Sequence, residues 1–409
     1  MTKEYTYVCV NCHNSINTQD ILYLCPQCVK KNKSGEALKG VLKVIYPYLE
    51  IKKKIFHKPD YLKVTNYLDL LPIEKLDSFP PLLIGQSPLY TFSDETDDNK
   101  AFKLHLKVES GNPTFSFKDR ASALVSAFAK EKGIDTIIAA STGNAGSSLA
   151  GICASQKQKA IILVPENAPK AKLTQVLMYG AKLIPIKGNY DDAYDLSLKL
   201  TEKYGWYNRN TAFNPLTIEG KKTVAFELFE QMKVLPDKIF VPVGDGVILS
   251  GVYKGFEDLF ELGLIRLIPQ IIAVQAEGSS NLIDNLQTDN PIFKSASTIA
   301  DSISVDIPRN YYMAKDFMLR YSGLGIKVSD TEIIDASKLL AKQFGLFVEP
   351  AAAAAYAGFM KHKNSGQISA KEQIVVLLTG NGLKDIASVS QTLDFPSPIN
   401  PKSFKFEQI

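Results

Sequence analysis

Short apolar runs alternate with segments of helical period along most of this chain, and this alternation constrains the fold more than any other feature. The apolar runs between residues 135 and 380 are DTIIAA, KAIILVPE, AKLIPI, DKIFVPVG, PQIIAVQA and EQIVVLLTG. Runs this continuously apolar are typical of strands that are buried on both faces. Segments such as YDDAYDLSLKLTEKYG and VILSGVYKGFEDLFELG lie between most of them and have the period of an amphipathic helix. The pattern predicts an α/β fold, in which helices cover both faces of a parallel sheet.

A hairpin is predicted before the parallel strands. The runs SPLYTFS and AFKLHLKVE are both strand-like, and the polar segment DETDDNK separates them. We expect the two strands to pair across this polar tip.

Length and charge limit the classes of partner. The chain has 409 residues, of which 45% are apolar and 22% charged, and its net charge is +4. This length accommodates roughly two or three domain-sized units. The basic residues are too dispersed to favour nucleic acid or a membrane surface as a partner. No run reaches the roughly 18 apolar residues of a membrane span, and MTKEYTYVCVNCHN lacks the apolar segment of a secretory signal. We therefore expect a cytoplasmic protein.

Four cysteines near the N-terminus have the spacing of a metal site. Cys9 and Cys12 form one C-x2-C motif, and Cys25 and Cys28 form a second one twelve residues later. Two such motifs can surround one zinc ion tetrahedrally and leave no open position, so the metal would be structural. The alternative is a set of free thiols left by a degenerate ribbon. We expect a zinc-ribbon module over residues 1–33, followed by a helical and loop-like connector over residues 34–81.

Three loops follow predicted strands at the edge where ligands bind in an open α/β sheet. They are STGNAGSS from Ser141, VPVGDGVILSG from Val241 and VVLLTGNGLKD from Val375. The first two combine glycines with a helix N-terminus, which offers free N–H groups to an anion. In the third, Thr379 leaves a buried strand and could meet a ring nitrogen. Each loop also has an ordinary interpretation as a helix cap or a strand–helix turn.

Lys118, in GNPTFSFKDR, lies at the start of a predicted helix, where the helix dipole disfavours a cation. It is either a solvated surface lysine or an amine that the protein needs at this place. At the mouth of a dry pocket its pKa should be lowered, and the neutral amine is the form that makes a Schiff base. We therefore expect pyridoxal 5'-phosphate, with Lys118 at its aldehyde, the Gly244 loop at its phosphate, Asn144 at its ring hydroxyl and Thr379 at its ring nitrogen.

Five motifs, SGNPTFSFKDR, STGNAG, NPLTIEGKKT, LFVEPAAAAA and LLTGNGLKD, together resemble the threonine synthase family, whose members have the two-lobed fold type II of pyridoxal-phosphate enzymes. The resemblance covers about residues 82–390. It implies a catalytic region of two α/β lobes over residues 82–400. The smaller lobe is expected at about residues 120–215. Family members are often dimers, so a homodimer is possible.

The resemblance also implies roles for individual residues. Lys118 matches the catalytic lysine that forms the Schiff base, and Phe117 the aromatic residue beside the cofactor ring. The cofactor-binding residues that it implies are Phe117, Lys118, Asn144, Gly244, Asp245, Gly246, Val247, Ile248, Leu249 and Thr379. The residues that it implies for the substrate carboxylate are Ser141, Thr142, Gly143, Asn144 and Ala145.

The chain departs from the family pattern at several positions. Phe115 replaces a familiar glycine, and the phosphate loop has Asp245 where many members have asparagine. Thr217 replaces an arginine, and Thr211-Ala212 replace Asn-Ser, in a segment that is expected to bind the substrate phosphate. Loss of a bidentate arginine removes a strong charge-assisted contact. Arg209, in YNRNT, could replace it as a substrate-binding residue from the same loop.

The reaction that the resemblance implies is the conversion of O-phospho-L-homoserine and water to L-threonine and phosphate. The alternative, which Thr217 motivates, is a sister enzyme of the same fold that performs β-replacement or β-elimination on phosphoserine, serine or threonine. A non-catalytic binding protein with a zinc ribbon for a partner is a third hypothesis. The retention of Lys118, Asn144 and Thr379 argues against it.

Overall fold

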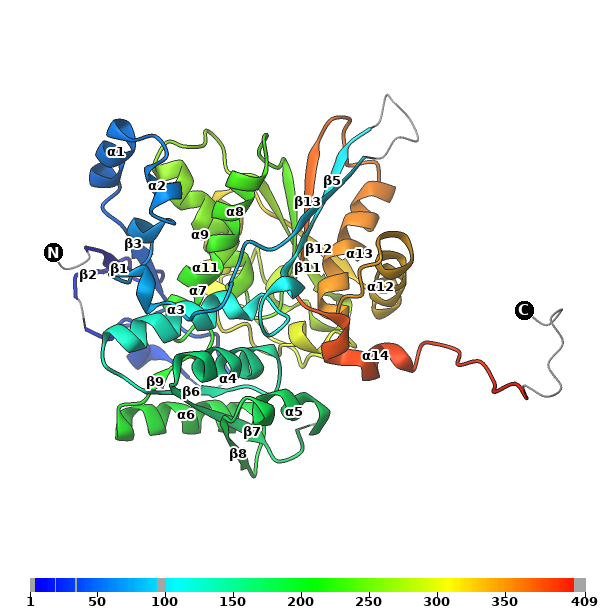
Figure 1. Cartoon of the computed structure of the whole chain (residues 1–409), viewed down its shortest axis with the longest axis horizontal. Coiled ribbons are helices and arrows are strands. Elements are labelled where there is room, and N and C mark those ends of the chain that lie inside the picture. The colour runs from blue at the N-terminus through cyan, green and yellow to red at the C-terminus, as the bar shows by residue number, and fades with distance from the viewer. Residues whose placement is uncertain (1–3, 19, 34, 94–100, 169, 401–409) are drawn as a thin grey trace.

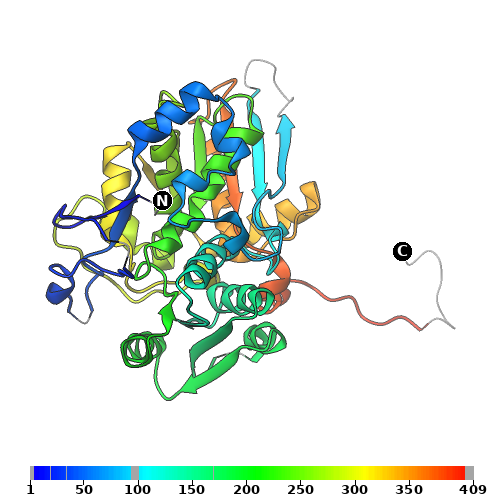
Figure 2. The same ribbon diagram turned by 60° about the vertical axis from the view of Figure 1, so that its left-hand side comes forward.

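The computed structural model describes residues 4–18, 20–33, 35–93, 101–168 and 170–400, so the predicted polar tip at 94–100 lies outside the described residues. These residues form two α/β lobes and an N-terminal module. Figures 1 and 2 show the small lobe below the large lobe and the N-terminal module along one side of the large lobe. This arrangement confirms the predicted two-lobed α/β class.

The large lobe is built on a sheet with the strand order β12-β11-β10-β13-β5-β4. Its strands are β4 (Leu89–Ser93), β5 (Lys103–Val108), β10 (Lys238–Pro242), β11 (Gln270–Ala276), β12 (Leu324–Val328) and β13 (Gln373–Leu378). All neighbouring strands are parallel except β4 and β5, which pair antiparallel as the predicted hairpin. The strand β12 was not predicted, because it is an edge strand whose residues are mostly exposed and therefore lack a continuous apolar run.

Alternate residues of the buried strands face two separate cores. Ile239 and Val241 point to helices α7, α8, α9 and α11, whereas Phe240 points to α12 and α13. The bounds of these helices are α7 (Leu216–Lys221), α8 (Thr223–Gln231), α9 (Val247–Glu261), α11 (Tyr311–Arg320), α12 (Asp330–Phe344) and α13 (Pro350–Asn364). Burial on both faces explains the continuously apolar sequence of these strands.

The small lobe repeats this design on a smaller scale. Its sheet has the order β8-β7-β6-β9 and is wholly parallel. The strands are β6 (Thr136–Ala140), β7 (Lys159–Pro165), β8 (Lys182–Ile186) and β9 (Tyr207–Asn208). The helices are α3 (Lys118–Glu131), α4 (Asn144–Gln156), α5 (Lys170–Met178) and α6 (Tyr190–Tyr204). Helix α6 packs on one face of the sheet, and α3, α4 and α5 pack on the other.

The N-terminal module extends beyond residue 33. Strand β1 (Thr6–Cys9) pairs with β2 (Ser15–Ile16) and also with β3 (Leu42–Ile45). The third strand therefore comes from the stretch for which we predicted a connector. A sequence of only four residues, LKVI, carries too little pattern to be recognised as a strand. Helices α1 (Tyr48–His57) and α2 (Tyr61–Val64) follow, and the short helices α10 (Asn281–Asp284) and α14 (Ile386–Ser390) complete the fold.

A buried ionic network joins this N-terminal part to the large lobe. The Lys222 ammonium donates to Glu219 at 2.5 Å and to Asp258 at 2.7 Å. The hydroxyls of Tyr46 and Tyr48 donate to the same two carboxylates at 2.6 and 2.5 Å. Charges that are this deeply buried are tolerated only when they are paired, so the network fixes α7 against α9 and against the N-terminal part. None of the described helices has the length and apolarity needed to cross a bilayer.

Candidate active site

The site lies where the start of α3 meets the end of β13. The Phe117 N–H donates to the carbonyl of Thr379 at 2.8 Å, and the Asn381 N–H donates to the carbonyl of Phe115 at 3.1 Å. Two segments that are more than 250 residues apart in the chain are thereby held side by side. The structure brings together Phe117, Lys118 and Thr379, as the sequence predicted.

Lys118 is the first residue of α3 and is partly buried. Burial lowers the pKa of its amine, Arg209 adds to this effect, and the carboxylates Asp245 and Glu349 oppose it. The direction agrees with the prediction for a lysine at a helix start in a dry pocket. A lowered pKa increases the fraction of neutral amine, which can act as a nucleophile or as a base.

Asn144 is the first residue of α4 and is buried. Its amide donates to the carboxylate of Glu349 at 2.8 Å and to the hydroxyl of Ser302 at 3.3 Å. The sequence did not single out Glu349, although it lies in the LFVEPAAAAA motif. Burial raises the pKa of the Glu349 carboxyl, and Asn144 and Lys118 act in the opposite direction.

The loop before α4 lies beside Asn144. The Ser141 hydroxyl accepts the Gly143 N–H at 3.2 Å, and Thr142, Gly143 and Ala145 are partly exposed. Their exposure leaves backbone N–H groups at a helix start within reach of a ligand.

The predicted phosphate loop is a tight turn at the start of α9. Gly246 has φ +85° and caps the helix, and a Cβ on Gly244 would lie 2.9 Å from the Cα of Ile303. Both positions therefore require glycine. Val247, Ile248 and Leu249 form the first turn of α9.

The carboxylate of Asp245, within this loop, accepts the Val247 N–H at 2.9 Å. Burial on its own would raise the pKa of Asp245, but the charges of Lys118 and Lys221 together with hydrogen bonds from Val247 and Thr211 lower it. Asp245 is therefore an anion that faces two lysines.

Two buried polar groups beside Asp245 lack hydrogen-bond partners among the described residues. They are Nη2 of Arg209 and Nζ of Lys221. Burial lowers the pKa of Arg209 to about 10, and burial together with the charge of Lys118 lowers the pKa of Lys221 well below its ordinary range. Buried polar atoms are nearly always paired in a complete structure, so unpaired donors of this kind indicate a ligand site.

Arg209 and Lys221 reach the site from different elements. Nε of Arg209 donates to the hydroxyl of Ser122 at 3.2 Å, and Ser122 lies one turn after Lys118 on the same face of α3. Thr217, in contrast, cannot replace the family's arginine. It is fully buried, and its hydroxyl donates to the carbonyl of Asn214 at 2.7 Å.

A cavity of about 460 Å³ is lined by Asn144, Glu349 and Phe115, among others. Phe115 is 49% exposed and has φ +68°. A left-handed backbone favours glycine, which explains why a glycine is familiar at this position. The Phe115 ring therefore narrows this cavity while its backbone stores strain.

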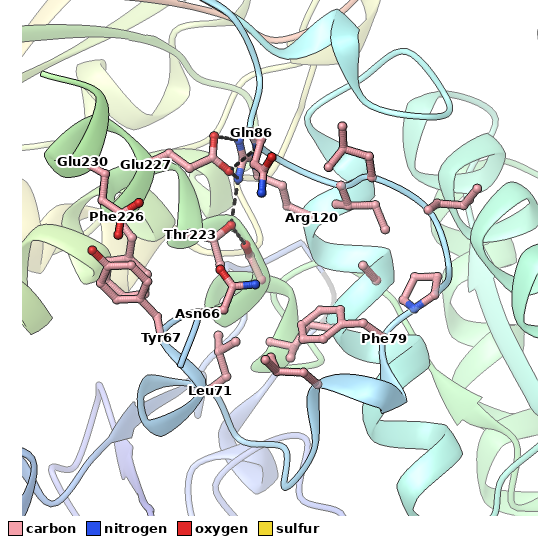
Figure 3. Close-up of a pocket in the computed structure, with 18 residues that line it drawn as sticks. Asn66, Tyr67, Leu71, Phe79, Gln86, Arg120, Thr223, Phe226, Glu227 and Glu230 are labelled. Carbon is pink, nitrogen blue, oxygen red and sulfur yellow. Dashed lines mark hydrogen bonds and ion pairs between the residues drawn. The ribbon is translucent and has the colours of Figure 1, made fainter. Parts of the chain in front are cut away.

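A second cavity, of about 290 Å³, borders α3 at Arg120, two residues after Lys118. Figure 3 shows Arg120 pointing to Thr223 and Glu227, to which it donates at 2.9 and 2.6 Å. It also donates to Glu109 at 2.7 Å. These bonds anchor the first turn of α3 and so fix the backbone from which the Lys118 side chain extends.

The four N-terminal cysteines form one cluster, in which all four sulfurs lie within 4.8 Å of one another. The Cys12 and Cys25 sulfurs are 3.7 Å apart, close to the roughly 3.8 Å that a tetrahedron with Zn–S bonds of about 2.3 Å requires. The donor set fits a structural zinc ion. Gly40, which lies beyond residue 33, packs closely against the cluster, because a Cβ there would lie 3.3 Å from the Cys28 Cβ.

One side chain of the N-terminal module contacts the segment that carries Arg209. The Tyr23 hydroxyl accepts the Asn208 N–H at 2.9 Å. Its ring stacks on Phe213 with centroids 4.5 Å apart. The N-terminal module therefore packs against residues 208–213 and helps to hold this segment in place.

The residues around Lys118 fit pyridoxal phosphate. The amine of Lys118 has a lowered pKa, unpaired cationic donors lie beside it, and the helix start of α9 offers N–H groups. The amide of Asn144 and the hydroxyl of Thr379 complete a set of donors suited to a phosphorylated pyridine ring.

Comparisons with known proteins identify the family of this chain. Residues 81–380 match the family model described as "Pyridoxal-phosphate dependent enzyme". The chain is 36% identical to the threonine synthase of Methanocaldococcus jannaschii over 92% of each chain. It is 33% identical to that of Methanosarcina acetivorans over 97% of this chain and 96% of the relative. Among solved structures, maize serine racemase matches with a TM-score of 0.63 and 26% identity over 75% of this chain and 91% of the racemase.

Proposed function

The chain belongs to the family of pyridoxal-phosphate-dependent enzymes, and from this premise we propose that it is a threonine synthase, a lyase that converts O-phospho-L-homoserine and water to L-threonine and phosphate. The relatives named threonine synthase, which match over nearly its whole length, support this activity. The observation that carries it is the meeting of Lys118 with the buried free donors of Arg209 and Lys221, since the substrate brings both an amino group and a phosphate dianion.

Lys118, Phe117, Asn144, Thr379 and the loop from Gly244 to Leu249 would hold the cofactor. When bound, pyridoxal phosphate supplies an electron sink for negative charge that develops on the substrate. A neutral hydroxyl from Thr379 at the ring nitrogen favours elimination and replacement over transamination, because it does not hold the ring protonated as an aspartate would.

Lys118 acts as the proton carrier in this proposal. Because burial lowers its pKa, its amine can take protons from Cα and Cβ of the substrate and return protons at Cγ and Cα. The loop from Ser141 to Ala145 binds the substrate carboxylate through its backbone N–H groups. Phosphate leaves from Cγ, and water adds at Cβ.

A second candidate function follows from Thr217. Because this side chain cannot bind a phosphate, a sister activity on phosphoserine, serine or threonine is the alternative. A screen of these amino acids against phosphohomoserine, with phosphate release as the readout, tests both. Turnover of phosphohomoserine at an ordinary rate excludes the sister activity, and turnover of serine or threonine alone excludes threonine synthase.

We also propose that the cysteine cluster holds structural zinc, that the protein is cytoplasmic, and that it forms a homodimer. Paired cysteines around a metal persist in a reducing compartment, which supports the location. Metal analysis of the purified protein and light scattering after size-exclusion chromatography test the zinc and the assembly.

A further inference from the structure

We propose that Lys221 is the residue that binds the substrate phosphate in this chain, together with Arg209, in place of the arginine that the family carries at position 217. The inference rests on the proposed function and names the specificity-determining cation of the same site. The sequence NPLTIEGKKT does not distinguish Lys221 from the adjacent Lys222, because both are lysines.

Burial without a partner distinguishes Lys221 from its neighbours. Lys221, Lys222 and Lys254 are all fully buried. Lys222 pairs with Glu219 and Asp258, and Lys254 pairs with Asp258. Nζ of Lys221 has no hydrogen-bond partner among the described residues. A buried amine that no group compensates destabilises the ligand-free protein, so its place in the fold needs another reason.

Close helix packing places Lys221 at the site. A Cβ on Gly220 would lie 2.3 Å from the carbonyl oxygen of Arg120, so the end of α7 contacts the first turn of α3 directly. A Cβ on Gly251 would lie 2.7 Å from the Cβ of Lys221, so the same residue contacts the first turns of α9. Lys221 therefore lies between the helix that begins with Lys118 and the helix that follows the phosphate loop.

The charges around Lys221 call for a doubly charged anion. Lys118, Arg209 and Lys221 interact electrostatically with one another and share the carboxylate Asp245. Glu349 also acts on Lys118, and Asp119 also acts on Arg209. Burial and Lys118 disfavour the charged form of Lys221 in the ligand-free protein, and an anion bound beside it would stabilise that form. A phosphate monoester dianion would accept hydrogen bonds from the free donors of Arg209 and Lys221.

Two phosphates could meet this cluster, one from the substrate and one from the cofactor. The cofactor phosphate has backbone donors available at the start of α9. The substrate phosphate has no donor from Thr217, whose hydroxyl is bonded within its own helix. The unpaired donors of Arg209 and Lys221 both belong to the segment 209–221. We therefore assign them to the substrate.

The test compares wild-type holoenzyme with Lys221→Met, which keeps the volume of the side chain and removes its charge. The KM for phosphohomoserine should rise about 10- to 100-fold, as expected for a lost charged hydrogen bond. The apparent affinity for pyridoxal phosphate, measured by absorbance titration, should stay within about twofold. An unphosphorylated amino acid, L-serine, should perturb the cofactor spectrum of both proteins at equal concentrations.

A thermal measurement separates this role from a structural one. Inorganic phosphate should raise the Tm of the wild type and not that of Lys221→Met. Without phosphate, the variant should be at least as stable as the wild type, because an uncompensated amine has been removed. Lys222→Met is the matched control, since it neutralises an equally buried but paired lysine and should lower the Tm with and without phosphate.

Each possible outcome either supports or overturns the inference. A KM and a phosphate-dependent Tm that are unchanged in both Lys221→Met and Lys221→Gln overturn the inference. Weaker cofactor binding with an unchanged KM also overturns it and assigns Lys221 to the cofactor phosphate. If the wild type does not turn over phosphohomoserine, the proposed function fails instead, and the loss of the phosphate-dependent Tm shift in Lys221→Met still identifies Lys221 as a phosphate ligand.

Discussion

The contact between Tyr23 and residues 208–213 predicts that the N-terminal module supports substrate binding. The Asn208 N–H donates to the Tyr23 hydroxyl at 2.9 Å, and Asn208 is fully buried. Tyr23→Phe removes the acceptor and leaves this N–H unsatisfied. Its cost is about 1–3 kcal/mol, because a buried donor without a partner loses its solvation uncompensated. Tyr23→Ala also removes the stacking on Phe213, which contributes about 0.5–1.5 kcal/mol beyond burial.

The functional effect should follow the segment that Tyr23 supports. Arg209 and Thr211 lie within it, whereas Lys118 and Thr379 do not. We expect Tyr23→Phe to raise the KM for phosphohomoserine and to leave the affinity for pyridoxal phosphate unchanged. The assays are urea denaturation of the zinc-loaded protein, steady-state kinetics and absorbance titration with the cofactor.

Tyr90→Phe is the matched control, because Tyr90 is 45% exposed on the edge strand β4. It should change neither stability nor KM. The reasoning is refuted if Tyr23→Phe has the same urea midpoint and KM as the wild type. It is also refuted if Tyr23→Phe lowers cofactor affinity and substrate affinity equally, since the effect would then spread through the whole site.

Further predictions concern the metal cluster, the catalytic lysine, the cavity and pH. Cys9→Ser should lower the Tm and leave the visible absorbance of the bound cofactor intact; loss of that band in a folded protein would contradict the separation of the two sites. Lys118→Ala should abolish both the band and turnover, and a retained band would exclude Lys118 as the cofactor lysine. Phe115→Gly should relieve about 1–2 kcal/mol of left-handed strain and widen the cavity, which a higher Tm and binding of a bulkier amino acid would confirm. Because the pKa of Lys221 is lowered on folding, the unfolded chain binds the extra proton, so the ligand-free wild type should gain stability relative to Lys221→Met as pH rises toward the ordinary lysine pKa. Denaturation of both proteins between neutral and alkaline pH checks this sign, and a constant difference would refute it.

The sequence by itself determined the elements of this protein. Continuous apolar runs identified the buried strands, because burial on both faces demands apolar side chains at every position. The edge strand β12 and the four-residue strand β3 were not predicted, because an exposed or very short strand lacks a continuous apolar run. Cysteine spacing also identified the cluster at the N-terminus, because two C-x2-C motifs have few other physical uses.

Local sequence likewise identified Lys118 as a lysine at a helix start, and α3 does begin there. It could not identify the partners of the site. Glu349 is one acid in an alanine-rich motif until folding brings it within 2.8 Å of Asn144, more than 200 residues away.

Only the tertiary structure decided the role of each lysine in the pair Lys221-Lys222. The two residues are adjacent and chemically identical, and both are buried. Lys222 forms ion pairs with Asp258 and Glu219, whereas Lys221 interacts electrostatically with Lys118, Arg209 and Asp245. A charge acquires its function from the groups that compensate it, and those groups come from α7, α9 and the loop before α9. The sequence records the charge, and the packing of these elements determines whether it is paired within the fold or left for a ligand.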